Sequence, residues 1–205
     1  MINDIYIKAR ATAVSRSTAK LMKTNQTTSY RTGDDGDIEA GRNTSFTVLA
    51  ENNPFGNTNR FTDELGGATY TNNIVIDWST YDGSTVLGWR RTDNGVDITW
   101  NNAIDGALAV SIGTFTTGWR LPNINELFSL VNSAGQSFNY APFNITSTFI
   151  FWSSNTNYSN TVRATALTNT NAGTGSLINY PTKASSSTCR YMPCRVFTVT
   201  GTTLS

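Results

Sequence analysis

GWRLPNINELFSLVN, residues 118–132, carries the clearest local structural signal in the chain. Asn123 can cap a first helical turn, and Glu126 three residues later completes a capping-box pattern. Pro122 disfavours helical backbone in the residue before it. The stretch therefore predicts a short helix that starts after Asn123. Its buried stripe is expected to consist of Leu127, Leu130 and Val131.

A second helix is predicted by TWNNAIDGALAV, residues 99–110. Either Thr99 or Asp97 is placed to cap its first turn. Apolar residues recur every fourth position, which puts them near one another on a helix. The expected buried face consists of Trp100, Ile104 and Leu108.

The rest of the chain has the pattern of short strands joined by long loops. Thr, Asn and Ser together make up 75 of the 205 residues, a composition that favours strands and turns. Short apolar runs are separated by Asn, Gly, Asp and Thr, and each run predicts a strand. These runs are residues 46–49, 74–78, 86–89, 149–154, 161–167 and 194–199.

Charge and composition exclude several classes of function. A net charge of +1 without a long basic run gives no footprint for a phosphate backbone, so we expect no nucleic-acid partner. The apolar runs are too short to insert into a membrane. Histidine is absent, which removes Ser-His-Asp and Cys-His mechanisms, and no carboxylate pair stands out. We therefore expect no enzymatic activity.

The two ends of the chain raise separate questions. Residues 1–25 are expected to form an arm or attachment segment before a domain of residues 26–205, and charges at Asp4 and Lys8 interrupt any signal-peptide core.

Cys189 and Cys194 are the only cysteines. Their spacing fits either a small hairpin disulfide or two unpaired thiols.

Several strings, taken in order, match one known pattern. They are KTNQTTSYRTGDDGDIEAG at 23–41, TWNNAIDGALAV at 99–110, GWRLPNINELFSLV at 118–131, FWSS at 151–154 and PCRVF at 193–197. With these strings the chain resembles the C-terminal domain family of collagen-like adhesins, the Lcl C-terminal domain. The resemblance implies an α+β, C-type-lectin-like fold with two helices, a small twisted antiparallel sheet and long loops. Relatives often carry a cysteine where this chain has Ala107 and Ala109, so the resemblance supplies no cross-domain disulfide here.

Large apolar residues near these motifs are expected to form the core, because an indole buries a large area and needs one partner for its N–H. The predicted core residues are Trp100, Trp119, Leu121 and Trp152. Arg120, beside Trp119, is expected to act as a structural fork to carbonyls or to a carboxylate.

The most favoured recognition surface is a set of loops rich in Asn and Tyr, since rigid aromatic area combined with adaptable polar groups suits a binding loop. Plain solvated loops and subunit contacts have the same composition. The candidate ligand-binding residues are Asn155, Asn157, Tyr158, Asn160, Asn169, Asn171, Asn179 and Tyr180. No cofactor is expected; the acidic cluster of Asp34, Asp35 and Asp37 is either a calcium site or ordinary turn chemistry.

These observations favour a non-enzymatic protein on the surface or tail of a phage virion that binds a receptor, mediates adhesion or decorates the capsid. Its expected partners are other virion proteins or further copies of itself, in an oligomer such as a trimer, and a host receptor or glycan. The alternative is an exported bacterial surface adhesin that binds host glycans or matrix. A protein of that kind would carry an export signal and basic clusters.

Overall fold

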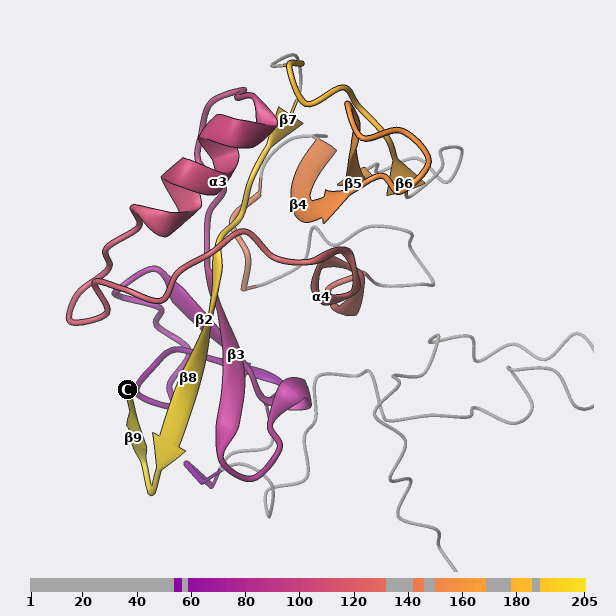
Figure 1. The fold of residues 1–205 in the computed structure, drawn as a ribbon. Coiled ribbons are helices and arrows are strands. Elements are labelled where there is room, and N and C mark those ends of the chain that lie inside the picture. The colour runs from indigo at the N-terminus through magenta and orange to yellow at the C-terminus, as the bar shows by residue number, and fades with distance from the viewer. Residues whose placement is uncertain (1–53, 57–58, 132–141, 146–149, 169–177, 186–188) are drawn as a thin grey trace, which may run out of the picture.

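A computed structural model describes residues 54–56, 59–131, 142–145, 150–168, 178–185 and 189–205. The predicted arm at 1–25, the acidic cluster at 34–37 and the apolar run at 46–49 lie outside these residues. The described chain is an α+β fold with two helices and two sheets (Figure 1). The expected α+β class with two helices is thus confirmed, whereas two sheets stand in place of the one small sheet that had been expected.

The larger sheet has five strands, and all of its pairs are antiparallel. In spatial order the strands are β1 (Phe61–Thr62), β2 (Ile74–Asp77), β3 (Thr85–Arg90), β8 (Cys194–Thr200) and β9 (Thr203–Leu204). The predicted apolar runs at 74–78, 86–89 and 194–199 correspond to β2, β3 and β8. A short 3₁₀ turn, η2 (Trp78–Thr80), follows β2.

The smaller sheet has four strands and contains one parallel pair, β4 with β7. In spatial order the strands are β6 (Ile178–Asn179), β5 (Ala164–Thr168), β4 (Ile150–Thr156) and β7 (Cys189–Arg190). The predicted runs at 149–154 and 161–167 correspond to β4 and β5. A register shift between Trp152 and Thr156 bends the end of β4, where the pairing with β5 resumes at Ala164.

One segment, residues 189–200, belongs to both sheets, and we call it the shared segment. It enters as β7 in the smaller sheet and leaves as β8 in the larger one. Between the two strands, backbone bonds continue to the end of β3 and the chain that follows it: the amide of Arg90 donates to Pro193 O at 3.0 Å and that of Asn94 to Tyr191 O at 3.1 Å. The two sheets are therefore held together by backbone hydrogen bonds as well as by side-chain packing.

Helix α3 (Trp100–Leu108) lies where the sequence predicted it, with Thr99 at the N-cap but without a side-chain cap bond. Its buried face differs from the prediction, because Ala103 and Ala107 are fully buried while Leu108 is 60% exposed. Residues four apart drift by about 40° per step on a helix, so Leu108 has rotated by about 80° from Trp100. The small alanines allow close packing against Trp152 and the alanines of β5.

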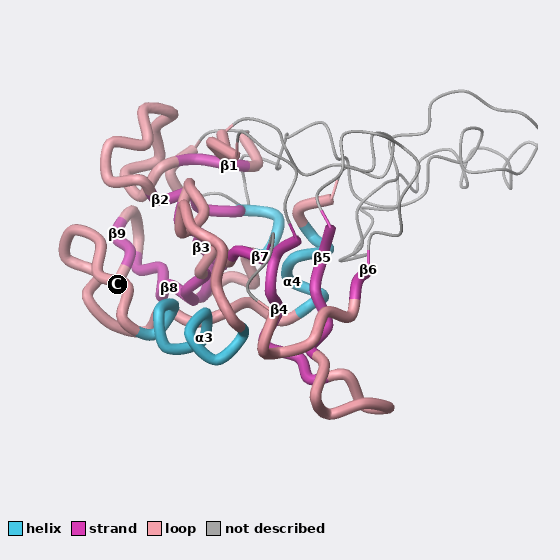
Figure 2. Tube along the Cα trace, turned by 90° about the horizontal axis from the view of Figure 1, so that it is seen from above, coloured by secondary structure: helices cyan, strands magenta, loops and turns pink. Residues whose placement is uncertain are grey.

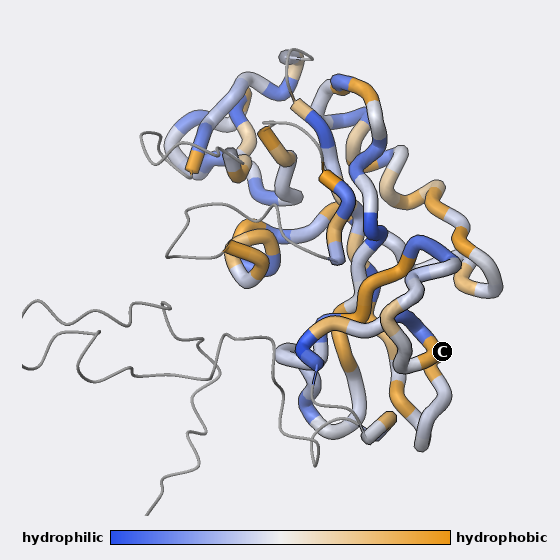
Figure 3. Tube along the Cα trace, turned by 180° about the vertical axis from the view of Figure 1, so that it is seen from behind, coloured by the Kyte–Doolittle hydropathy of each residue, from blue (hydrophilic) through white to orange (hydrophobic). Residues whose placement is uncertain are grey.

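Helix α4 (Ile124–Ser129) confirms the capping-box prediction in both directions. The amide of Glu126 donates to the side chain of Asn123 at 2.9 Å, and the Asn123 amide donates to Glu126 Oε2 at 2.7 Å. Leu127 and Leu130 are fully buried, as expected, and Val131 is partly buried beside them. Figure 3 shows α4 mostly in the orange of apolar residues.

The core predictions hold for Trp119, Leu121 and Trp152, which are all buried. The indole N–H of Trp119 donates to Phe115 O and that of Trp152 to Ile98 O, each at 2.8 Å. Trp100 differs, because it is only half-buried at the margin of the cluster around Trp152. It begins α3, where one face of the indole is left to pack against a side chain from elsewhere in the chain.

A buried ion pair that the sequence did not reveal connects β1 to β2. Arg60 Nε and Nη2 donate to the two carboxylate oxygens of Asp77 at 2.8 and 2.7 Å, and both side chains are almost fully buried. Asp77 also caps η2 by accepting the amide of Ser79 at 3.1 Å. The bidentate geometry pairs the two buried charges with each other.

We predict that Gly88→Ala destabilises the fold by about 1–3 kcal/mol, the usual cost of overpacking a core. An added Cβ would lie 2.4 Å from Cε2 of Phe197 and 3.0 Å from Cδ1 of Ile76. Denaturant unfolding followed by tryptophan fluorescence measures the change. Val196→Ala, half-exposed on β8, is the control and should change stability by less than about 0.5 kcal/mol. Equal stability of Gly88→Ala and the native chain would contradict this close packing.

Candidate functional site

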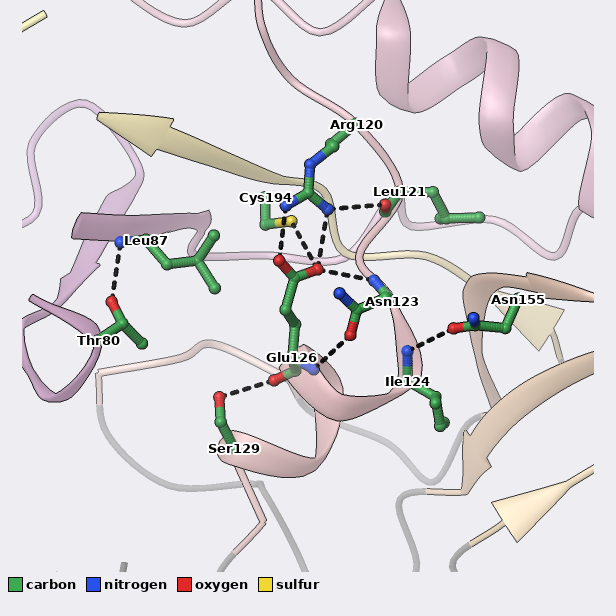
Figure 4. Close-up of polar contacts among 10 residues, drawn as sticks. All are labelled: Thr80, Leu87, Arg120, Leu121, Asn123, Ile124, Glu126, Ser129, Asn155 and Cys194. Atoms are coloured by element: carbon green, nitrogen blue, oxygen red, sulfur yellow. Dashed lines mark hydrogen bonds and ion pairs between the residues drawn. The ribbon is translucent and has the colours of Figure 1, made fainter. Parts of the chain in front are cut away.

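An ion pair between Arg120 and Glu126 joins the chain after Trp119 to helix α4 (Figure 4). Arg120 Nη1 and Nη2 donate to the two oxygens of Glu126 at 2.8 and 2.6 Å. Nη1 also donates to Leu121 O at 3.3 Å. The guanidinium is thus the structural fork predicted from its place beside Trp119.

The same pair is joined to the shared segment through the backbone. The amide of Arg120 donates to Cys194 O at 2.9 Å, and the Cys194 amide donates to Arg120 O at 3.0 Å. The Cys194 thiol lies 3.9 Å from Glu126 Oε2. The carboxylate therefore faces an arginine, a capped helix end and a buried thiol, and the arrangement is structural.

Asn155 was predicted to bind ligand, but its carbonyl oxygen has an internal partner. It lies in β4 and accepts the amide of Ile124, the first residue of α4, at 2.8 Å (Figure 4). Asn123 and Asn155 together thus satisfy two amides at the start of α4. This contact ties the helix to the smaller sheet.

Two loops at the end of the smaller sheet lie side by side, and we call residues 155–163 and 179–185 the two-loop surface. The amide of Lys183 donates to Val162 O at 2.9 Å. Arg163 Nη1 donates to Tyr180 O at 2.5 Å. The turn between β4 and β5 projects from the end of the sheet (Figure 2), and hydrogen bonds hold it to the second loop. In this way the structure brings six of the eight predicted ligand residues together.

Exposed apolar side chains gather on the two-loop surface. Tyr158 is 98% exposed, Val162 63% and Tyr180 44%. Elsewhere in the described chain, large hydrophobic residues with comparable exposure lie on separate elements, as with Leu65 after β1. Exposed apolar area concentrated at one projecting site is characteristic of a binding surface.

The asparagines of this surface shape its loops. The carbonyl oxygen of Asn157 accepts the Ser159 amide at 2.9 Å. Asn160 accepts the Val162 amide at 3.3 Å, and Asn179 accepts the amide of its neighbour Tyr180 at 2.8 Å. Such bonds fix turns locally. The remaining predicted residues, Asn169 and Asn171, lie outside the described chain.

Lys183 was missed by the sequence reasoning. Its Nζ lies 4.2 Å from the centroid of the Trp100 ring and donates to Thr156 Oγ1 at 2.8 Å. The cation covers the free face of the half-buried indole, so Trp100 is not open for stacking on a ligand. The three residues come from α3, β4 and a loop, and no local sequence pattern connects them.

Across the described ranges, no group of three or more His, Cys, Asp or Glu side chains is arranged to hold a metal ion. The calcium prediction for Asp34, Asp35 and Asp37 falls outside those ranges. Among the same described residues, no helix is long and apolar enough to cross a membrane.

The model of the Lcl C-terminal domain matches residues 79–192, more than half of the chain. The chain belongs to this family. The resemblance found in the sequence had extended from residue 23 to about 198, so the match confirms its central part. It contains both helices and the whole two-loop surface. No curated protein and no solved structure matches the chain. Membership indicates an adhesin-related function.

In this Lcl C-terminal domain the two cysteines are unpaired and buried. Of the two arrangements that the sequence allowed, the structure therefore has two thiols. Burial, with a further contribution from Asp97, raises the pKa of Cys189 to about 11. Burial raises the pKa of Cys194 further, and the nearby Glu126 carboxylate adds to the effect. Both thiols stay protonated at neutral pH and make poor nucleophiles.

We predict that Glu126→Gln destabilises the domain by about 1–3 kcal/mol, the range for hydrogen bonds to charged groups. The effect should fall in the lower part of this range, because the Arg120 side chain is 38% exposed and solvent screens it. Urea unfolding at pH 7 measures it. Asp105→Asn, exposed on α3, is the matched control and should leave stability nearly unchanged.

The same variant gives a prediction for pH. Burial raises the pKa of the Glu126 carboxyl, but hydrogen bonds from Arg120 and the Asn123 amide together bring it below its ordinary 4.5. Its stabilisation is complete above pH 4.5 and is lost as the pH falls below that value. The native chain should therefore lose more stability than Glu126→Gln on acidification from pH 5 towards pH 3. Parallel acid profiles would argue against this assignment.

A third prediction concerns the thiols. At pH 8 the folded chain should react slowly with an aromatic disulfide reagent, because both thiols are buried and protonated. In denaturant without reductant both should react at once. A rapid reaction of the folded chain, or no free thiol after unfolding, would contradict the structure.

Proposed function

We propose that this chain is a non-enzymatic adhesion protein that binds its target through the two-loop surface. The observation that carries the proposal is the gathering of Tyr158, Val162 and Tyr180 on loops fixed by internal hydrogen bonds. Loops fixed in advance lose little entropy on binding. Membership in the Lcl C-terminal domain family supports the same class of function.

The absence of catalysis is part of this proposal, and the chemistry of the described residues supports it. The chain contains no histidine. Glu126 accepts bonds from Arg120 and from the Asn123 amide, and the adjoining Cys194 thiol is buried and protonated. No cofactor is needed for the proposed binding.

We also propose that the fold is C-type-lectin-like. Support comes from the two helices, the antiparallel larger sheet and the long loops at one end of the smaller sheet. The two-loop surface then lies where such a fold displays its variable segments, which is an argument by fold analogy.

For the location of the protein we propose display on a phage virion, as a tail or capsid-surface component with residues 1–25 as the attachment segment and residues 26–205 as the binding domain. The uncharged Thr- and Asn-rich composition supports exposure on a particle. Gold-labelled antibodies on purified particles should detect the chain. The mass in solution should fall from an oligomer to a monomer when residues 1–25 are removed.

A second candidate is an exported bacterial adhesin that binds host glycans or matrix, which family membership favours. The two cations of the two-loop surface, Arg163 and Lys183, already have internal partners. A heparin column at low salt separates the candidates. Strong retention supports the exported adhesin, and absence of the chain from purified particles rejects the virion location.

We predict that Tyr158→Ala lowers adhesion of the labelled chain to intact target cells by about tenfold, the effect of losing roughly 1.4 kcal/mol of contact energy. The melting temperature should not change, because the side chain is 98% exposed. Leu65→Ala, which removes a hydrophobic residue that is 77% exposed outside the surface, is the control and should bind normally. Equal loss in both variants, or no loss in either, would reject the two-loop surface as the binding site.

A further inference from the structure

We infer that the two-loop surface recognises a polypeptide segment in which carboxylate side chains stand next to apolar ones. This inference rests on the proposed function, because it names the class of target that the same surface binds. It follows from the distribution of charge along the chain, from the partners of two cations, from the orientation of four side-chain amides and from the exposed apolar groups.

The last part of the chain carries positive charge only. All 14 Asp and Glu residues lie at or before Glu126, and residues 127–205 contain four Lys and Arg residues and no acidic residue. All four strands of the smaller sheet belong to this part of the chain. Neither loop of the two-loop surface therefore has a carboxylate of its own to neutralise its cations.

The two cations of the surface have only uncharged partners among the described residues. Arg163 is exposed, and its Nη1 donates to Tyr180 O at 2.5 Å. Lys183 Nζ donates to Thr156 Oγ1 at 2.8 Å and lies over the Trp100 ring. These contacts hold both groups in place without neutralising them. Three other arginines of the described chain do pair with carboxylates: Arg60, Arg120 and Arg190.

The side-chain amides of the surface add donors rather than acceptors. A backbone N–H can only donate, so the side-chain atom that faces it is the carbonyl oxygen. Four asparagines accept a backbone amide in this way at 2.8–3.3 Å: Asn155, Asn157, Asn160 and Asn179. Within the described residues, none of their NH₂ groups donates to another protein atom. The surface thus presents cations and N–H donors, which match a carboxylate because that group only accepts.

Exposed apolar groups favour a polypeptide among the polymers that carry carboxylates. Val162 precedes Arg163 and is 63% exposed, and Tyr158 is 98% exposed. The amide of Lys183 donates to Val162 O, so the cations and the apolar side chains lie together. A tyrosine ring can pack on a sugar, but an exposed valine gains from burial against another apolar group. Among charged polymers, a polypeptide carries such groups beside its carboxylates.

The combination of charge and apolar area predicts how binding responds to salt. Exposed ion pairs are screened as the ionic strength rises, whereas the burial of apolar side chains is not. Binding should therefore weaken between low and high salt without being lost. A ligand held by charge alone would be released steeply over the same range.

The test measures binding of the full chain to three immobilised probes: a copolymer of glutamate and tyrosine, a copolymer of lysine and tyrosine, and heparin. We expect binding to the glutamate copolymer, weaker retention on heparin and none on the lysine copolymer. Lys183→Gln removes the charge but keeps an N–H donor near Thr156, so it should weaken binding about two- to fivefold, the effect of one exposed ion pair. Lys183→Arg keeps the charge and should bind like the native chain.

Arg195→Gln is the matched control, because it removes the same charge from β8, where the guanidinium packs on the rings of Phe115 and Phe197. It should bind like the native chain. Equal loss in Lys183→Gln and Arg195→Gln would overturn the inference, since binding would then follow net charge and not this surface. Retention on heparin without binding to the glutamate copolymer would also overturn it, in favour of an anionic glycan.

A second copy of the chain is another conceivable occupant of the surface, because residues 34–39 are acidic. The mass in solution should therefore be the same for Lys183→Gln and the native chain. A fall from an oligomer to a monomer in this variant would place a second copy on the surface and overturn the inference.

Treatment of target cells separates this inference from the proposed function. Protease removes surface proteins, and mild periodate oxidation destroys sugar diols. Adhesion that requires Tyr158 should be lost after protease and should survive periodate. Its loss after periodate would reject a polypeptide target while leaving the proposed adhesive function intact. Adhesion that is independent of Tyr158 would reject the surface itself and with it both proposals.

Discussion

The contact between Arg120 and Glu126 is the interaction on which the other parts of the described fold depend. Glu126 accepts two bonds from the guanidinium and one from the Asn123 amide, so a single carboxylate fixes both the chain after Trp119 and the start of α4. The backbone of Arg120 then pairs with Cys194 in the shared segment. Because the shared segment belongs to both sheets, this local contact sets the position of α4 relative to each of them.

The parts of the structure that sequence predicted are those governed by neighbouring residues. The capping box of α4 involves atoms three residues apart, and the buried leucine stripe follows directly from it. Leu108 was placed wrongly because period-four spacing only approximates the helical repeat, and the small Ala103 and Ala107 fit the neighbouring strands better. Lys183 over Trp100 could not be predicted, since it joins residues distant in the sequence.

In the candidate surface, too, the sequence indicated local features and did not reveal tertiary contacts. Asn and Tyr enrichment indicated these loops as candidates, and the structure brings Tyr158 and Tyr180 to the same end of the smaller sheet. Composition does not reveal how an amide is used, however. Asn155 was predicted as a ligand contact, yet its oxygen accepts the first amide of α4, so only its NH₂ group is free for recognition. Only the tertiary structure shows that the carbonyl oxygen of this amide has an internal partner while its NH₂ group does not.

The shared segment also constrains the order in which the fold can form. Residues 189–200 follow β1 to β6 in the chain, yet they supply the pairing partner of β3 in one sheet and of β4 in the other. During synthesis, neither sheet is complete until these residues have left the ribosome. Until then β3 and β4 each lack a neighbour, and unpaired strand edges promote aggregation. Contacts between residues so far apart also make folding slow, which prolongs the exposure of these unpaired edges.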